Sequence, residues 1–131
     1  MTNSDDQNRD LNEMFFISKI ACGLEIVRPW RSEIWFRPDN MKIVIERIRN
    51  FGGQIYGIDL SLMHNRKWMI IGTIDYPELE QLDIDHLDYY DRCVNYAKMD
   101  YIDTPFICGP TFGFDKAFLR EWHNGEGSPS S

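Results

Sequence analysis

The chain has 131 residues, of which 43% are hydrophobic and 14% aromatic, and it carries a net charge of −7. A chain of this length fits one domain, and its apolar content excludes wholesale disorder. Its acidity disfavours general binding to nucleic acid or to an anionic membrane, since both are polyanions. The charge fits a basic protein partner better, and the competing interpretation is that it simply keeps the protein soluble.

The N-terminal part predicts two helices separated by a strand. Asp10 and Glu13 have the spacing of a capping box, and apolar residues at helical spacing follow them, which predicts a helix over about 11–22. Residues 32–37 alternate between apolar and polar side chains and predict a strand. A turn then leads to a second helix over about 41–51, which has one apolar face.

The most regular pattern in the chain is that of a β-hairpin over about 55–74. Two runs in which apolar residues alternate with other side chains flank the polar connection at 64–67, which has the length of a hairpin loop. Because two strands are only marginally stable alone, we expect the strand at 32–37 to extend this sheet.

The C-terminal part predicts two more helices, over about 84–99 and 115–123. Between them, residues 100–113 contain two prolines and two glycines, so the pattern indicates irregular structure or one short strand around 106–108. Together these elements predict an α+β fold, in which a small antiparallel sheet packs with three to four helices.

These elements predict a single α+β domain over 10–125, with a flexible N-terminus at 1–9 and a flexible tail at 126–131. The three cysteines form an odd set without a C-x-x-C pair, which is untypical of a secreted disulfide scaffold. The N-terminal residues lack the basic and apolar regions of a signal peptide, and no apolar run approaches the roughly 20 residues of a membrane span. We therefore expect a soluble, cytoplasmic protein.

An acidic, tyrosine-rich segment over 75–103 is the most distinctive feature. It holds nine acidic residues against two basic ones, whereas 28–49 holds six basic residues against three acidic ones. On a helix, one side of the acidic segment carries a core stripe and the opposite side carries tyrosines among carboxylates. Tyrosine rings make effective binding anchors, and carboxylates steer a basic partner. The predicted contact residues are Asp85, Asp88, Tyr89, Tyr96 and Met99. The competing interpretation is that neighbouring loops cover the tyrosines.

A second segment combines arginines with tryptophans and could hold a phosphate, a carboxylate or a base. The residues considered for this alternative, an anion-binding site, are Arg28, Arg31, Trp35 and Arg37. The competing interpretation is a strand whose aromatic side chains enter the core while the arginines cover its edge.

No motif indicates catalysis, a cofactor or a metal. His86 and Cys93 are seven residues apart, which on a helix separates them by about 10 Å along the axis, too far to share a metal ion. Carboxylates on a regular helix diverge rather than converge on a cation. We therefore expect a protein that is not an enzyme and that needs no cofactor.

Small size, acidity and missing catalytic motifs are shared by inhibitors of basic enzymes, such as bacterial toxin-immunity proteins and phage counter-defence proteins. This likeness is one of type and covers no stretch of residues. The leading hypothesis is a protein-binding inhibitor that occludes a basic partner, such as a toxin or nuclease, through the acidic helix. The alternatives are a self-associating subunit or adaptor, and a small enzyme or anionic-ligand-binding domain centred on 28–37.

Overall fold

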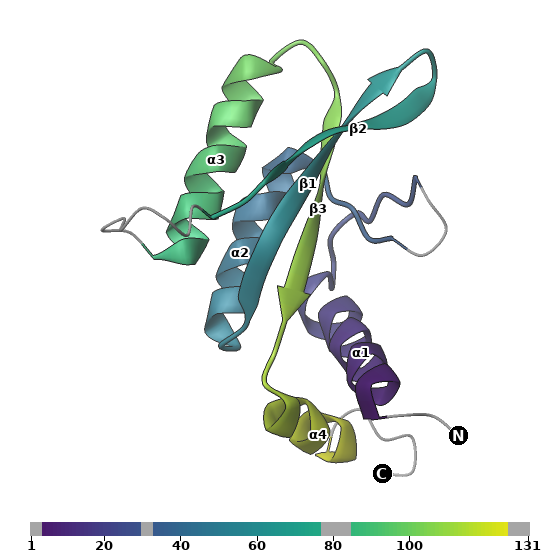
Figure 1. The fold of residues 1–131 in the computed structure, drawn as a ribbon, viewed down its shortest axis with the longest axis vertical. Coiled ribbons are helices and arrows are strands. Elements are labelled where there is room, and N and C mark those ends of the chain that lie inside the picture. The colour runs from purple at the N-terminus through teal and green to yellow at the C-terminus, as the bar shows by residue number, and fades with distance from the viewer. Residues whose placement is uncertain (1–3, 30–32, 77–84, 126–131) are drawn as a thin grey trace.

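The computed structural model describes residues 4–29, 33–76 and 85–125. In chain order its elements are α1 (Ser4–Phe15), a π-helical turn η1 (Phe16–Ile20), a 3₁₀ turn η2 (Pro38–Asn40), α2 (Met41–Asn50), β1 (Gln54–His64), β2 (Lys67–Ile74), α3 (His86–Asp100), β3 (Phe106–Gly113) and α4 (Lys116–Gly125). Figure 1 shows α3 and α2 beside the sheet, and α1 and α4 near the far end of β3.

The three strands form one antiparallel sheet in the order β2-β1-β3, which confirms the predicted α+β fold. β1 and β2 form the predicted hairpin, joined at Asn65 and Arg66. Both turn residues have a positive φ, 50° and 64°, as a two-residue hairpin turn of type I′ requires. The flanking residues His64 and Lys67, expected in the connection, instead close the ladder as a pair.

The third strand is β3 and not the segment 32–37, which corrects the prediction for that segment. Trp35 and Phe36 form only isolated bridges, to Val27 and to Cys108, and residue 32 lies outside the described residues. Every residue of β3 from Phe106 to Pro110 is buried. A strand that is covered on both faces has apolar residues in succession and not in alternation. The sequence of β3 therefore lacks the alternating pattern that identifies a half-buried strand.

The orientation of Pro110 explains how β3 accommodates a proline. Cys108 exchanges both backbone hydrogen bonds with Phe36, so the backbone of Cys108 faces away from β1. Two residues later, Pro110 faces the same way by the alternation of an antiparallel ladder. Its missing N–H is therefore on the outer side of β3 and removes no bond to β1.

The helices follow the predicted order. The bounds of α2, α3 and α4 lie close to the predicted 41–51, 84–99 and 115–123. The first helix, however, begins at Ser4, so helical structure extends into the stretch expected to be flexible and the predicted start at residue 11 is wrong. Ser4 is followed by two aspartates, which is itself a favourable sequence for a helix start.

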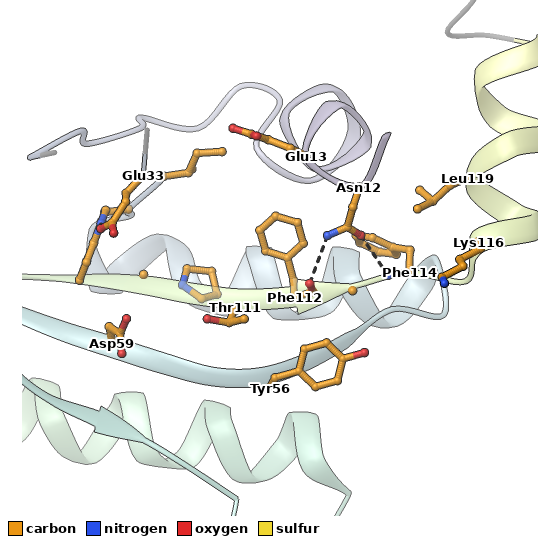
Figure 2. Close-up of a pocket in the computed structure, with 15 residues that line it drawn as sticks. Asn12, Glu13, Glu33, Tyr56, Asp59, Thr111, Phe112, Phe114, Lys116 and Leu119 are labelled. Atoms are coloured by element: carbon orange, nitrogen blue, oxygen red, sulfur yellow. Dashed lines mark hydrogen bonds between the residues drawn. The ribbon is translucent and has the colours of Figure 1, made fainter. Parts of the chain in front are cut away.

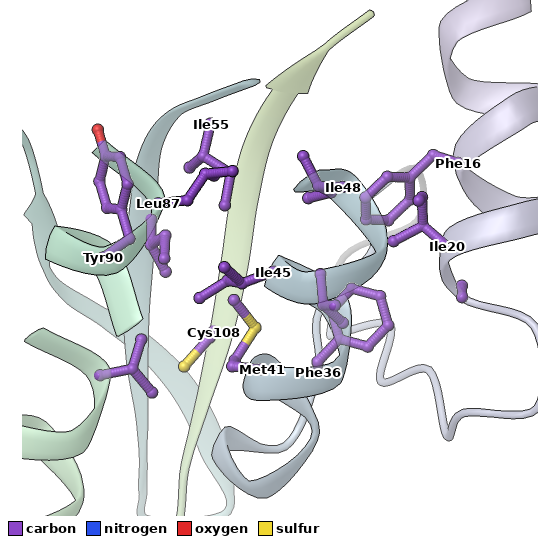
Figure 3. Close-up of a cluster of buried hydrophobic side chains, with 14 of the residues drawn as sticks. Phe16, Ile20, Phe36, Met41, Ile45, Ile48, Ile55, Leu87, Tyr90 and Cys108 are labelled. Atoms are coloured by element: carbon purple, nitrogen blue, oxygen red, sulfur yellow. The ribbon is translucent and has the colours of Figure 1, made fainter. Parts of the chain in front are cut away.

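α2 and α3 pack against one face of the sheet and run antiparallel to each other. The end of α2 meets the start of α3 through Arg49 and Asp85, while Lys98 near the end of α3 lies 2.8 Å from Asp39 before α2. Figure 3 shows side chains of the core that they enclose. Its buried members include Val44, Ile45 and Ile48 of α2, Leu87, Tyr90 and Val94 of α3, and Ile55, Ile58 and Cys108 of the sheet.

The opposite face of the sheet is partly covered as well. Ile107 and Gly109 flank Cys108 and therefore face the other way. Trp35 lies directly over Gly109, where an added Cβ would come within 2.8 Å of its ring, and both Trp35 and Ile107 are almost fully buried. The chain before α2 therefore serves as a cover for β3 rather than as a strand of the sheet.

Candidate functional site

α3 carries the residues predicted to bind a partner, and its first turn is set by a cap. Asp85 has an extended backbone, and its side chain accepts a hydrogen bond of 2.7 Å from the N–H of Leu87. A carboxylate here satisfies one of the N–H groups that a helix start leaves unpaired. Leu87, Tyr90 and Val94 are buried, so the amphipathic pattern correctly predicts which side of α3 faces the core.

Asp85 and Asp88 are bound within the molecule by one arginine. Arg49 of α2 donates hydrogen bonds to both carboxylates, with 2.6 Å between its Nη2 and Oδ1 of Asp88. The hydrogen bond from Arg49, followed by the one from the backbone of Leu87, lowers the pKa of the Asp85 carboxyl. The same contact with Asp85 raises the pKa of the Arg49 guanidinium. These two carboxylates therefore join α3 to α2, and the arginine compensates part of their charge.

Tyr89 lies on the flank of α3 that faces the end of β2. Its ring meets Tyr76 edge-on with 5.2 Å between the centroids, and it meets Tyr90 in the same way at 5.8 Å. Tyr76 also stacks on His86 at 3.7 Å. Tyr89 is half-buried, so it packs the chain that leaves β2 against the start of α3.

Tyr96 and Met99 are in the opposite situation, because they project from the last turns of α3 into solvent. Their exposed fractions are 66% and 72%, and Ile102, just beyond the helix, reaches 80%. The carboxylates of Asp100 and Asp103 are exposed beside them. We call these five residues the α3 stripe. Ile102 was not predicted, although extending the helical spacing from Met99 by one turn would have found it.

The structure thus divides the predicted contact set into two groups. Asp85, Asp88 and Tyr89 come together at the start of α3, where Arg49 and neighbouring rings hold them. Tyr96 and Met99 lie near the end of the helix. Since a helix rises about 1.5 Å per residue, roughly 16 Å separate Asp85 from Tyr96 along the axis.

The residues considered for anion binding were Arg28, Arg31, Trp35 and Arg37. Arg31 lies outside the described residues, and Arg28 is exposed. The indole N–H of Trp35 donates to the Glu33 carboxylate at 2.8 Å, and Arg37 lies 3.6 Å from the Glu25 carboxylate. The chain therefore supplies carboxylate partners for both Trp35 and Arg37 from within itself.

A cavity of about 610 Å³ opens beside this segment, between α1, β3 and the start of α4 (Figure 2). Aromatic rings form much of its wall, and Asn12 holds the end of β3 there by bonding to the backbone of Phe112 and Phe114. Its charged lining consists of Glu13, Glu33, Asp59 and Lys116. Three carboxylates against one lysine repel an anion and favour a neutral or cationic ligand. The cavity therefore gives no support to anion binding.

The cysteines differ in their surroundings. Cys108 is fully buried, and burial raises the pKa of its thiol to about 12. A thiol with such a pKa stays protonated and behaves as a small apolar core residue. Cys93 is half-buried, and Cys22 is exposed.

Within the ranges described, no group of three or more histidine, cysteine or acidic side chains could hold a metal ion. Over those same ranges, no helix is both long and apolar enough to span a membrane. Comparison with protein-family models, curated proteins and solved structures finds no match to this chain.

Proposed function

We propose that this chain is a protein-binding inhibitor that uses the α3 stripe to cover a basic surface of its partner. One observation carries the proposal: three large apolar side chains are each at least 66% exposed, Tyr96 and Met99 near the end of α3 and Ile102 in the turn that follows it. Single exposed apolar residues are common on proteins, but a cluster rimmed by charges is typical of an interaction site.

The chemistry of the α3 stripe suits a protein partner. Tyr96 offers a large, rigid ring with a polar end, and Met99 adapts its shape to the surface that it meets. Asp100 and Asp103 lie at the rim, where charges raise the association rate more than the final affinity. In this proposal Asp85, Asp88 and Tyr89 act indirectly, because their contacts with α2 and Tyr76 hold α3 in place.

The partner class follows from charge. A chain with 21 acidic and 14 basic residues attracts a basic protein and repels nucleic acid and anionic membranes. A toxin or nuclease with a basic active-site cleft is the kind of target that such a surface occludes, as immunity and counter-defence proteins do. The inhibitor acts in this proposal by coverage, without chemistry of its own, in the cytoplasm where such targets work.

The experiment compares three immobilised baits in lysate of cells that naturally make this chain. The baits are the natural protein, a variant with Tyr96→Ala, Met99→Ala and Ile102→Ala, and a control with Tyr56→Ala. Tyr56 is a tyrosine of nearly the same exposure, 61%, on β1. We expect a basic protein that the natural chain and the control retain and the triple variant loses.

Calorimetry with the purified partner then measures the affinity. Truncating a central anchor costs about 2 kcal/mol or more, so Tyr96→Ala alone should weaken binding at least tenfold. Association should also slow as salt rises, because the carboxylates of the α3 stripe are exposed. A partner that binds the triple variant as tightly as the natural chain would refute this surface.

A further inference from the structure

β2 is an edge strand with an apolar surface. Within the described part of the chain, no strand pairs with its outer side. Three consecutive side chains, Met69, Ile70 and Ile71, are between 41% and 54% exposed. Natural proteins usually protect a free edge with charges, proline or a covering element. Here residues 68–74 include neither a charge nor a proline, so the composition of this edge favours pairing with another chain.

The pairing pattern determines which backbone groups of β2 face outward. The N–H of Met63 donates to the carbonyl of Pro105, so the backbone of Met63 faces β3. Its partner on β2, Trp68, therefore turns its own N–H and C=O away from β1. By the alternation of an antiparallel ladder, Ile70 faces outward as well.

A bulge after Ile70 interrupts the ladder between β1 and β2. On the far side of the bulge, the pairing of β1 with β3 determines which backbone groups of β2 face outward. Because Cys108 faces away from β1, its partner Leu60 directs its backbone toward β2. Leu60 pairs with Gly72, and the next residue, Thr73, consequently faces outward. The outward groups of Ile70 and Thr73 are thus three residues apart, with the bulge between them.

This irregular spacing of the outward groups favours pairing with β2 of a second copy of the chain. A regular strand presents its hydrogen-bonding groups every second residue, so it cannot match both Ile70 and Thr73. A second β2, antiparallel and related by a two-fold axis, has the same irregularity in the same place. We infer that two copies of the chain pair through β2, with Ile70 of each copy opposite Thr73 of the other.

The side chains at the axis are compatible with this arrangement. The axis passes between Ile71 and Gly72, so Ile71 lies beside Gly72 of the second copy. Apart from Gly72 and its two chain neighbours, no atom of the described residues lies within 4 Å of the position that a Cβ on Gly72 would occupy, which leaves room for the incoming side chain. The strand also has Lys67 at its start and Asp75 just after its end. Antiparallel pairing brings these opposite charges to the same end of the interface, whereas parallel pairing would set like charges together.

The test is the oligomeric state of the full chain, measured by light scattering and sedimentation equilibrium from micromolar to millimolar concentration. We expect twice the 15.5 kDa mass of one chain. Gly72→Lys should give a monomer, because the space beside Gly72 is open in a single chain but is filled by Ile71 of the second copy in the dimer. Lys67→Asp should weaken the dimer at least tenfold, and adding Asp75→Lys should restore it.

Met99→Lys is the control, since it places a lysine on an exposed apolar residue of the α3 stripe, away from β2, and should leave the dimer intact. Circular dichroism of each variant establishes that it is folded. A natural chain that stays monomeric throughout, or a folded Gly72→Lys variant that dimerises normally, would overturn the inference. So would loss of the dimer in Met99→Lys alone. Because the two surfaces differ, failure here leaves the proposed inhibitor function untouched, and the reverse also holds.

Discussion

At the scale of single residues, Asp85 links local and long-range structure. It caps α3 through the N–H of Leu87, and it binds Arg49 from the neighbouring helix. The cap satisfies a backbone group that would otherwise lack a partner at the helix start, while the ion pair is partly exposed and screened by solvent. The cap should therefore contribute more to stability than the ion pair does.

Three variants separate these two contributions. Asp85→Ala removes the cap and the ion pair and should lower the free energy of unfolding by about 1–2 kcal/mol. Asp85→Asn keeps a capping oxygen and should cost less than about 1 kcal/mol, as should Asp88→Ala, which loses only the contact with Arg49. Urea unfolding measures each value. If Asp85→Ala is no more harmful than Asp88→Ala, the cap is not the larger contribution.

The same residue predicts a pH dependence. Because its hydrogen bonds lower the pKa of Asp85 in the folded state, the carboxylate stabilises the fold fully above its unfolded pKa of about 4. That stabilisation is lost as the pH falls through the lower, folded pKa. The difference in stability between the natural chain and Asp85→Asn should therefore be constant near neutral pH and shrink below about pH 4. A difference that grows on acidification would contradict this sign.

At the scale of elements, the hairpin turn contains a local conflict. Arg66 has a φ of 64°, a conformation that favours glycine or asparagine over arginine. Asn65, the other turn residue, is well suited to its position. The regular strands on both sides determine the register, and the turn adopts the geometry that this register requires.

Arg66→Gly should relieve that conflict. We expect the free energy of unfolding to rise by about 1 kcal/mol, because glycine adopts this φ without steric hindrance. Arg66→Ala is the matched control, since it removes the same side chain but keeps the Cβ and should bring no comparable gain. Thermal and urea unfolding measure both. Equal stabilisation by the two variants would show that the side chain, and not the backbone, was responsible.

At the scale of the whole molecule, the sheet is enclosed on two sides near β3. α2 and α3 cover one face, and the chain around Trp35 covers the other through close contact with Gly109. β2, at the other edge, has no such cover within the described residues, and most of its side chains are exposed. Among the described residues the sheet is therefore asymmetric, because the segment around Trp35 and Phe36 covers β3 while no element covers the outer edge of β2.

Gly109→Ala tests this enclosure. An added Cβ would lie 2.8–3.0 Å from three atoms of the Trp35 ring, so the tryptophan must move, and we expect a loss of about 1–3 kcal/mol in the free energy of unfolding. Gly72→Ala is the matched control on the same sheet, because its Cβ position is open and the monomer should be unaffected. Urea unfolding followed by tryptophan fluorescence measures both. Unchanged stability of Gly109→Ala would mean that the cover is loose.

The sequence alone determined the hairpin, the four helices apart from the start of the first, and the side of α3 that faces the core. These follow from local periodicity, which records how a segment divides between apolar and polar surroundings. It did not determine the third strand: β3 is buried on both faces and so lacks alternation, while 32–37 alternates and yet forms only isolated bridges.

Only the tertiary structure decided which residues of the acidic segment are exposed. Periodicity placed Asp88, Tyr89 and Tyr96 on or near one outer face of a helix, and it could not show that Arg49 and Tyr76 would meet the first two while leaving Tyr96 in solvent. Arg49 is distant in sequence and reaches Asp88 only because α2 and α3 run antiparallel. The exposure of a side chain depends on such neighbours from distant parts of the sequence. For that reason the pattern within one segment cannot predict it.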